Sequence, residues 1–185
     1  MKNFIREYPL LSLCGLSCGL CTMHLGGYCP GCGGGDGNQP CAIAKCSREH
    51  GNVEFCCHCS EYPCAKYDAI DRYDSFISTQ NLRDNLETVK NLGLPSCREV
   101  LEAKRALLNK LLEHYNAGRQ KSFFANAVNL LELSDLQSVL SILEQHTASL
   151  SLKERAAQAV SILQTAASAR NIDLKLRKKP SKERI

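Results

Sequence analysis

Cysteine is the residue type with the most chemical potential in this chain. There are 12 cysteines among the 185 residues, and eleven of them fall between Cys14 and Cys64. Thiolates bind zinc and iron–sulfur clusters, and two cysteines separated by two residues can turn both sulfurs toward one ion. Three pairs have this C-x2-C spacing, and a fourth pair has four residues between its cysteines. The pairs are Cys18/Cys21, Cys29/Cys32, Cys56/Cys59 and Cys41/Cys46.

Four such pairs can close two tetrahedral four-cysteine sites, and the spacing leaves open which pairs join. Ten cysteines are the expected metal ligands: Cys14, Cys18, Cys21, Cys29, Cys32, Cys41, Cys46, Cys56, Cys59 and Cys64. Zinc, as two or more ions, is the expected cofactor because it is the common occupant of paired knuckles. An iron–sulfur cluster is the alternative. The role of Cys57 stays open, and Cys97 is expected to pack or to be a surface thiol.

The start of the chain lacks the pattern of a secretory signal, since Glu7 and Pro9 interrupt its apolar stretch. No run reaches the roughly 18 apolar residues that span a bilayer. We therefore expect a cytoplasmic protein without a membrane partner. In a reducing compartment, dense cysteine indicates metal ligation rather than disulfide bonds.

The elements that must position these thiols differ between the two halves of the chain. Ten of the 12 glycines lie between Cys14 and Cys64, which rules out long helices there. The expected fold class is mainly α: a small irregular cysteine-rich metal-binding module followed by a bundle of four to five helices. The predicted division is residues 1–74 for the module, 75–171 for the bundle and 172–185 for a short strand or basic tail.

Five helices are predicted after Cys64 from apolar residues at helical spacing and from end signals. The first ends at Gly93 and Pro95. Ser96 with Glu99, Ser134 with Gln137, and Ser151 with Glu154 have the spacing of capping boxes that open three of the others. The residues expected to face the core are Leu82, Leu86 and Val89; Val100, Leu101, Leu107, Leu108, Leu111 and Tyr115; Phe124, Ala127, Val128 and Leu131; Leu136, Val139, Leu140 and Leu143; and Ala156, Val160, Leu163 and Ala167.

The runs CGLSCGLC, CPGC, CAIAKC and FCCHCSEYPC resemble the cysteine-rich bacterial and archaeal family called domain of unknown function 3795. The strong likeness covers about residues 12–66 and includes the ten candidate ligands, whereas Cys57 is an addition to the pattern. The resemblance implies metal binding through these cysteines and implies no particular activity.

Three functions fit these patterns. The first is a non-catalytic structural-zinc module with a helical part that binds a protein partner, because a closed four-cysteine site has no open position for substrate. The second is an iron–sulfur or thiol-based redox protein. The third is a zinc-knuckle nucleic-acid binder, because residues 170–185 carry seven basic and two acidic side chains. No triad pattern accompanies the histidines, so the chain is not expected to be a classical enzyme.

Overall fold

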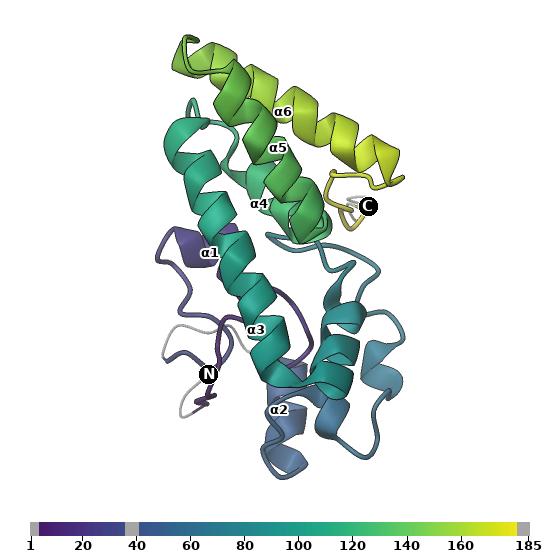
Figure 1. Ribbon diagram of the computed structural model, residues 1–185. Coiled ribbons are helices and arrows are strands. Elements are labelled where there is room, and N and C mark those ends of the chain that lie inside the picture. Colours follow the sequence, from purple (N-terminus) through teal and green to yellow (C-terminus); the bar gives the residue numbers. More distant parts are fainter. Residues whose placement is uncertain (1–3, 36–40, 181–185) are drawn as a thin grey trace, which may run out of the picture.

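The computed structural model describes residues 4–35 and 41–180. It confirms a mainly helical chain in which a cysteine-rich region precedes a helical bundle (Figure 1). The elements of the cysteine-rich region are short: η1 (Cys18–Leu20), α1 (Thr22–Leu25), α2 (Ala42–Glu49), η2 (Cys56–His58) and η3 (Ala65–Tyr67). The bundle consists of α3 (Leu82–His114), α4 (Lys121–Leu130), α5 (Leu133–His146) and α6 (Leu152–Ala169).

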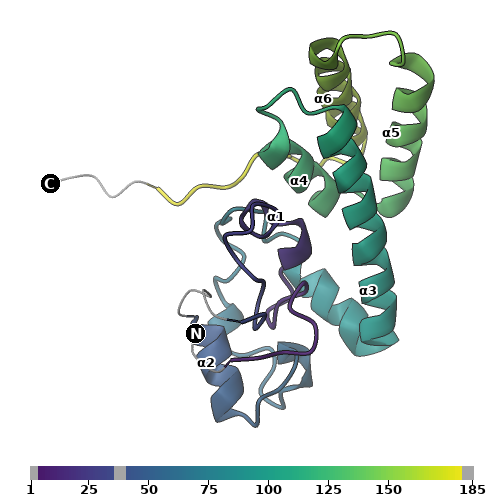
Figure 2. The same ribbon diagram turned by 90° about the vertical axis from the view of Figure 1, so that its left-hand side faces the viewer.

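The long helix α3 connects the two regions. Figure 2 shows it running from the cysteine-rich part to the layer formed by α4, α5 and α6. Gly93 interrupts it with φ 81° and ψ 164°, a conformation that glycine adopts readily, so α3 has two arms that meet at a bend. The predicted end of a helix at Gly93 is therefore confirmed.

The predicted start at Ser96 is wrong. Pro95 already lies inside the second arm, and the Ser96 hydroxyl donates back to the carbonyl of Leu92 instead of capping the helix. The cap at Ser134 is also wrong, because α5 begins at Leu133 with Glu132 before it. The capping box of Ser151 and Glu154 is confirmed in both of its hydrogen bonds.

Nearly all of the predicted core positions are buried or partly buried, and Val100 is the exception at 45% exposed. The apolar core is not confined to the bundle. Leu20, Phe55 and Tyr67 from the cysteine-rich region belong to the same buried cluster as Leu86 of α3. The short elements near the cysteines are thus anchored by apolar packing, although their sequence is rich in glycine.

Residues 172–180 contain no strand, and the first part of this segment packs against the bundle. The carbonyl of Leu174 accepts a hydrogen bond from the buried side chain of Asn126 on α4. Farther along, Arg177 binds the fully buried carboxylate of Asp74. The C-terminal segment therefore ties α4 to the loop that precedes α3. Lys182 and Arg184 of the predicted basic tail lie outside the described residues.

No helix among residues 4–35 and 41–180 combines the length and apolar character needed to cross a membrane.

Candidate metal centre

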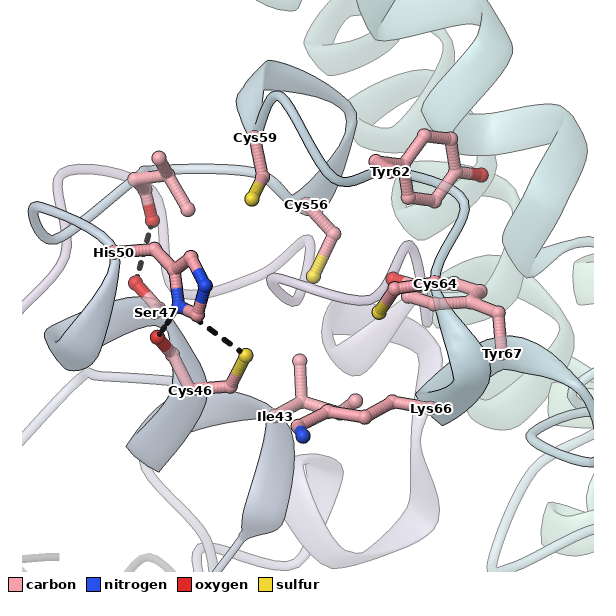
Figure 3. A pocket seen from close by; sticks show the side chains of 11 residues that line it. Ile43, Cys46, Ser47, His50, Cys56, Cys59, Tyr62, Cys64, Lys66 and Tyr67 are labelled. Carbon is pink, nitrogen blue, oxygen red and sulfur yellow. Dashed lines mark hydrogen bonds between the residues drawn. The ribbon is translucent and has the colours of Figure 1, made fainter.

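Four of the candidate ligands line one small cavity in the cysteine-rich region. Cys46 comes from α2, Cys56 and Cys59 from the η2 turn, and Cys64 from the residue before η3. The four sulfurs point into the shared space (Figure 3). The cavity measures about 20 Å³ and opens partly to solvent. A space of this size holds roughly one water-sized atom.

Tight turns bring these thiols together. The amide of Cys59 donates to the carbonyl of Cys56 at 3.0 Å, which closes the C-x2-C turn. The amide of Tyr67 donates to the carbonyl of Cys64 at 2.8 Å and closes the next turn. A longer-range bond from the amide of Cys56 to the carbonyl of Leu13 fixes the first turn against the N-terminal segment. The spacing of the cysteines therefore determines each turn, and the tertiary fold determines how closely the turns approach one another.

The hydroxyl of Tyr67 is a buried polar group without a hydrogen-bond partner of normal geometry among the described residues. It faces the four-cysteine cavity (Figure 3). Burial, together with the neighbouring Cys56 thiol, raises the pKa of Tyr67 far above its usual value. The group stays protonated and can donate. An unpaired buried donor is unfavourable, and a thiolate at the cavity would accept its hydrogen bond.

The thiols around this cavity affect one another. The pKa of Cys56 is raised to about 12, mainly by burial and in part by the thiols of Cys14, Cys46 and Cys64, against the lowering effect of the Tyr67 hydroxyl. Neutral thiols are thus favoured when no cation is nearby. A cation at the cavity would favour the thiolates instead, because opposite charge stabilises the ionised form.

His50 lies beside this group on the end of α2. Its Nδ1 is 2.9 Å from the Cys46 carbonyl oxygen and 3.6 Å from the Cys46 sulfur, and its Nε2 is 3.1 Å from Glu61 Oε1. The Cys46 carbonyl and then Glu61 raise the pKa of His50. Both ring nitrogens face acceptor oxygens, so a protonated imidazole can donate on both sides. Its shortest contact with Cys46 is to the backbone carbonyl.

A second group of thiols forms from the earlier cysteines. The pKa of Cys18 is raised well above its usual value by burial and by the nearby thiols of Cys32, Cys14, Cys21 and Cys29. This group lies between η1, α1 and the loop that contains Gly31.

Cys41 is exposed. It belongs with this second group, because its charge raises the pKa of the Cys14 and Cys32 thiols. Cys46 lines the other cavity. The two cysteines of the C-x4-C pair therefore lie in different groups. The path of α2 separates them, because Cys41 precedes the helix and Cys46 lies within it.

Arg6 places a buried positive charge beside the second group. Its guanidinium donates to the carbonyls of Leu11 at 2.7 Å and Cys32 at 3.2 Å, and it pairs with Glu54 at 3.0 Å. Burial raises the pKa of the Cys32 thiol, and the Arg6 charge lowers it in part. Arg6 was not predicted from the sequence, because its partners Cys32 and Glu54 come from distant segments.

The remaining two cysteines stand apart from both groups. Cys57 is half-buried toward α3, where burial raises its pKa and Lys90 lowers it in part, and it does not line the cavity. Cys97 is 6% exposed within the core, in agreement with a packing role. Tyr67 and His50 were also missed by the sequence analysis. The spacing of Cys46 and His50, four residues apart on one helix face, is the signal that could have identified His50.

Within residues 4–35 and 41–180, no group of three or more His, Cys, Asp or Glu side chains is arranged to hold a metal ion as the side chains stand. No family model, curated protein or solved structure matches this chain. The function of this chain must therefore be inferred from the thiol groups.

Proposed function

We propose that this chain is a metal-binding protein whose cysteine-rich region holds structural zinc. The observation that carries the proposal is the convergence of Cys46, Cys56, Cys59 and Cys64 from separate segments on one cavity. Four thiolates are the donor set of closed structural zinc sites. A cavity of about 20 Å³ suits a single ion better than a larger group.

The polar groups around the cavity fit the same proposal. The buried Tyr67 hydroxyl next to Cys56 would donate to a thiolate, and His50 contacts the Cys46 carbonyl. Such surrounding donors orient ligands and compensate the negative charge of a thiolate site. Bound zinc would cross-link α2, the η2 turn and the segment before η3, which carry these cysteines. Coordination would bring the four sulfurs, which already point into the cavity, closer to one another.

The second thiol group supports a second ion. Cys14, Cys18 and Cys32 lie together with Cys41 nearby, and Arg6 offsets part of the negative charge that thiolates would bring. Closed sites leave no position for a substrate. The proposed role is therefore non-catalytic, with the helical bundle as the part that binds a protein partner.

Elemental analysis of anaerobically purified protein, with an absorbance spectrum, tests the metal. We expect colourless protein with about two zinc ions per chain, as two four-thiolate sites require. Visible charge-transfer absorbance with stoichiometric iron and sulfide would show that the thiols hold an iron–sulfur cluster instead of zinc. Protein without bound metal, after refolding with zinc under reducing conditions, would refute metal binding altogether.

Neighbouring cysteines provide a matched pair of variants. Cys59 lines the cavity, whereas Cys57, two residues earlier, does not. We expect Cys59→Ser to lose about one zinc per chain and Cys57→Ser to retain both, because a serine hydroxyl is a poor replacement for a thiolate ligand. Cys18→Ser should lose the other ion. Equal zinc content in all three variants would contradict the ligand assignment.

A further inference from the structure

A second cavity, away from the thiol groups, lies between the two arms of α3 and the α4–α5 connection. It measures about 290 Å³. Asn85 lines it from the arm before Gly93, Cys97 and Lys104 line it from the arm after Gly93, and Glu132 lines it from the connection. A cavity of this size accommodates a small metabolite.

Lys104 is the reactive group of this cavity. Its ammonium is partly buried and donates to the carbonyl of Asn129 at 3.2 Å. Among the described residues it forms no ion pair. Burial lowers the pKa of Lys104, and the more distant carboxylate of Glu132 offsets this only in part. More of its amine is therefore uncharged near neutral pH than in an exposed lysine, and an uncharged amine is a nucleophile.

The walls of the cavity indicate the ligand. The amide nitrogens of Asn81 and Asn85 already donate to the carbonyls of Asn129 and Gly15, at 2.7 and 2.8 Å. Their side-chain oxygens remain as acceptors. The carboxylates of Asp84 and Glu132 add two further acceptors at the rim.

An acceptor-rich wall binds hydroxyl donors and repels carboxylates. We propose that Lys104 captures a small uncharged hydroxyaldehyde in this cavity as a Schiff base.

The proposed step balances without any other reactant. The unprotonated Nζ of Lys104 attacks the carbonyl carbon of the aldehyde and a C–N bond forms. Both amine protons end on the former carbonyl oxygen, which leaves as water as the C=N bond forms. Nothing is oxidised or reduced. This chemistry is independent of the thiol groups and of the proposed zinc.

Glyceraldehyde with cyanoborohydride tests the proposal, because the reagent reduces a C=N bond to a stable secondary amine. Full-length protein is labelled at pH 7 and the modified lysines are located by peptide mass spectrometry. Lys110 is the internal control, since it lies on the same arm, is exposed and pairs with Glu144 at 3.5 Å. Because burial lowers the pKa of Lys104, we expect Lys104 to be labelled faster than Lys110 at this pH.

Two further results are expected. Labelling of Lys104 saturates with glyceraldehyde concentration, whereas that of Lys110 stays linear. Pyruvate gives a smaller ratio of Lys104 to Lys110 labelling than glyceraldehyde does, because the rim repels its carboxylate. Lys104→Arg removes the saturable label, and Lys110→Arg retains it. Labelling of Lys104 that is no faster than that of Lys110, or that does not saturate, overturns the proposal. That comparison uses wild-type protein and does not depend on how Lys104→Arg folds.

Discussion

The substitution Asp74→Asn tests how the C-terminal segment is held. The Asp74 carboxylate has no exposed surface, and its Oδ1 lies 2.8 Å from Arg177 Nη2. It also accepts from the Arg177 amide at 2.7 Å and the Thr79 amide at 2.8 Å. Burial alone would raise the pKa of Asp74, but the hydrogen bonds from Arg177 and Thr79 outweigh it and hold the pKa well below its usual range. Asparagine keeps the size of the side chain and loses its charge.

The size of the effect follows from the burial of the two partners. Removing one partner from a buried ion pair destabilises a protein by about 3–5 kcal/mol. Arg177 is 40% exposed, so water can solvate its charge once the pair is lost. Asparagine also keeps one oxygen acceptor for Thr79. We therefore expect a loss of about 2–3 kcal/mol in the free energy of unfolding. For a chain of this length this corresponds to a decrease in Tm of about 4–12 °C.

Urea unfolding monitored by circular dichroism measures this loss at pH 7. Because the folded pKa of Asp74 is below its unfolded value of about 3.9, its stabilising contribution is present above that pH and declines as the pH falls through it. The difference between wild type and Asp74→Asn should therefore shrink from pH 6 to pH 3. Acid changes the protonation of the thiols equally in wild type and Asp74→Asn, so the thiols do not contribute to the difference between the two proteins.

The control is Asp71→Asn, which breaks a pair with Arg83 whose two side chains are 34% and 41% exposed. A loss of less than about 1 kcal/mol is expected there. If Asp74→Asn is no more destabilising than Asp71→Asn, or if its effect is independent of pH, the Asp74–Arg177 pair does not hold the segment.

Two further predictions concern a glycine in a turn and a helix cap, and urea unfolding measures both. At Gly15, with φ +91°, a Cβ would lie 1.9 Å from the carbonyl oxygen of Leu82, so Gly15→Ala should destabilise by about 2–4 kcal/mol. Gly118→Ala, at φ +101° in open space, should lose only about 1–2 kcal/mol, and equal losses would refute the steric argument. Ser151→Ala should lose about 1 kcal/mol by removing a helix cap, while Ser134→Ala, inside α5, should change stability by less than about 0.5 kcal/mol. The reverse order would refute the observed cap.

The helices were predictable because their signals are local. Apolar residues at helical spacing identified the buried faces, and Gly93 marked the bend in α3. The two wrong caps have a common cause. A serine followed three residues later by Glu or Gln can sit inside a helix as well as before one, and Ser96 and Ser134 both do so. Only the φ and ψ angles of the preceding residues decide between these cases, and spacing does not contain them.

The candidate site was predictable only in part. Cysteine spacing identified the turns, but it could not assign Cys41 and Cys46 to different groups, because that depends on where α2 starts. Tyr67 and Arg6 were missed for a related reason. Arg6 donates to the Cys32 carbonyl across 26 positions of the sequence, and Tyr67 is held at the cavity by its burial in the core shared with α3. Local patterns carry no information on such contacts.

The shared core has a consequence for how metal binding and stability are linked. Tyr67 lines the proposed zinc cavity and Phe55 precedes its ligand Cys56, and both belong to the same buried cluster as Leu86 and Leu108 of α3. A ligand that binds only the folded state adds its binding free energy to the stability of every element that unfolds with its site. Since the core is continuous, zinc at the thiol cavity should stabilise the helical bundle as well as the loops. The cysteine-rich region and the bundle are then expected to unfold as one cooperative unit, because the large core spans both and the separate cluster of Phe4, Leu13 and Ala44 among the described residues is small.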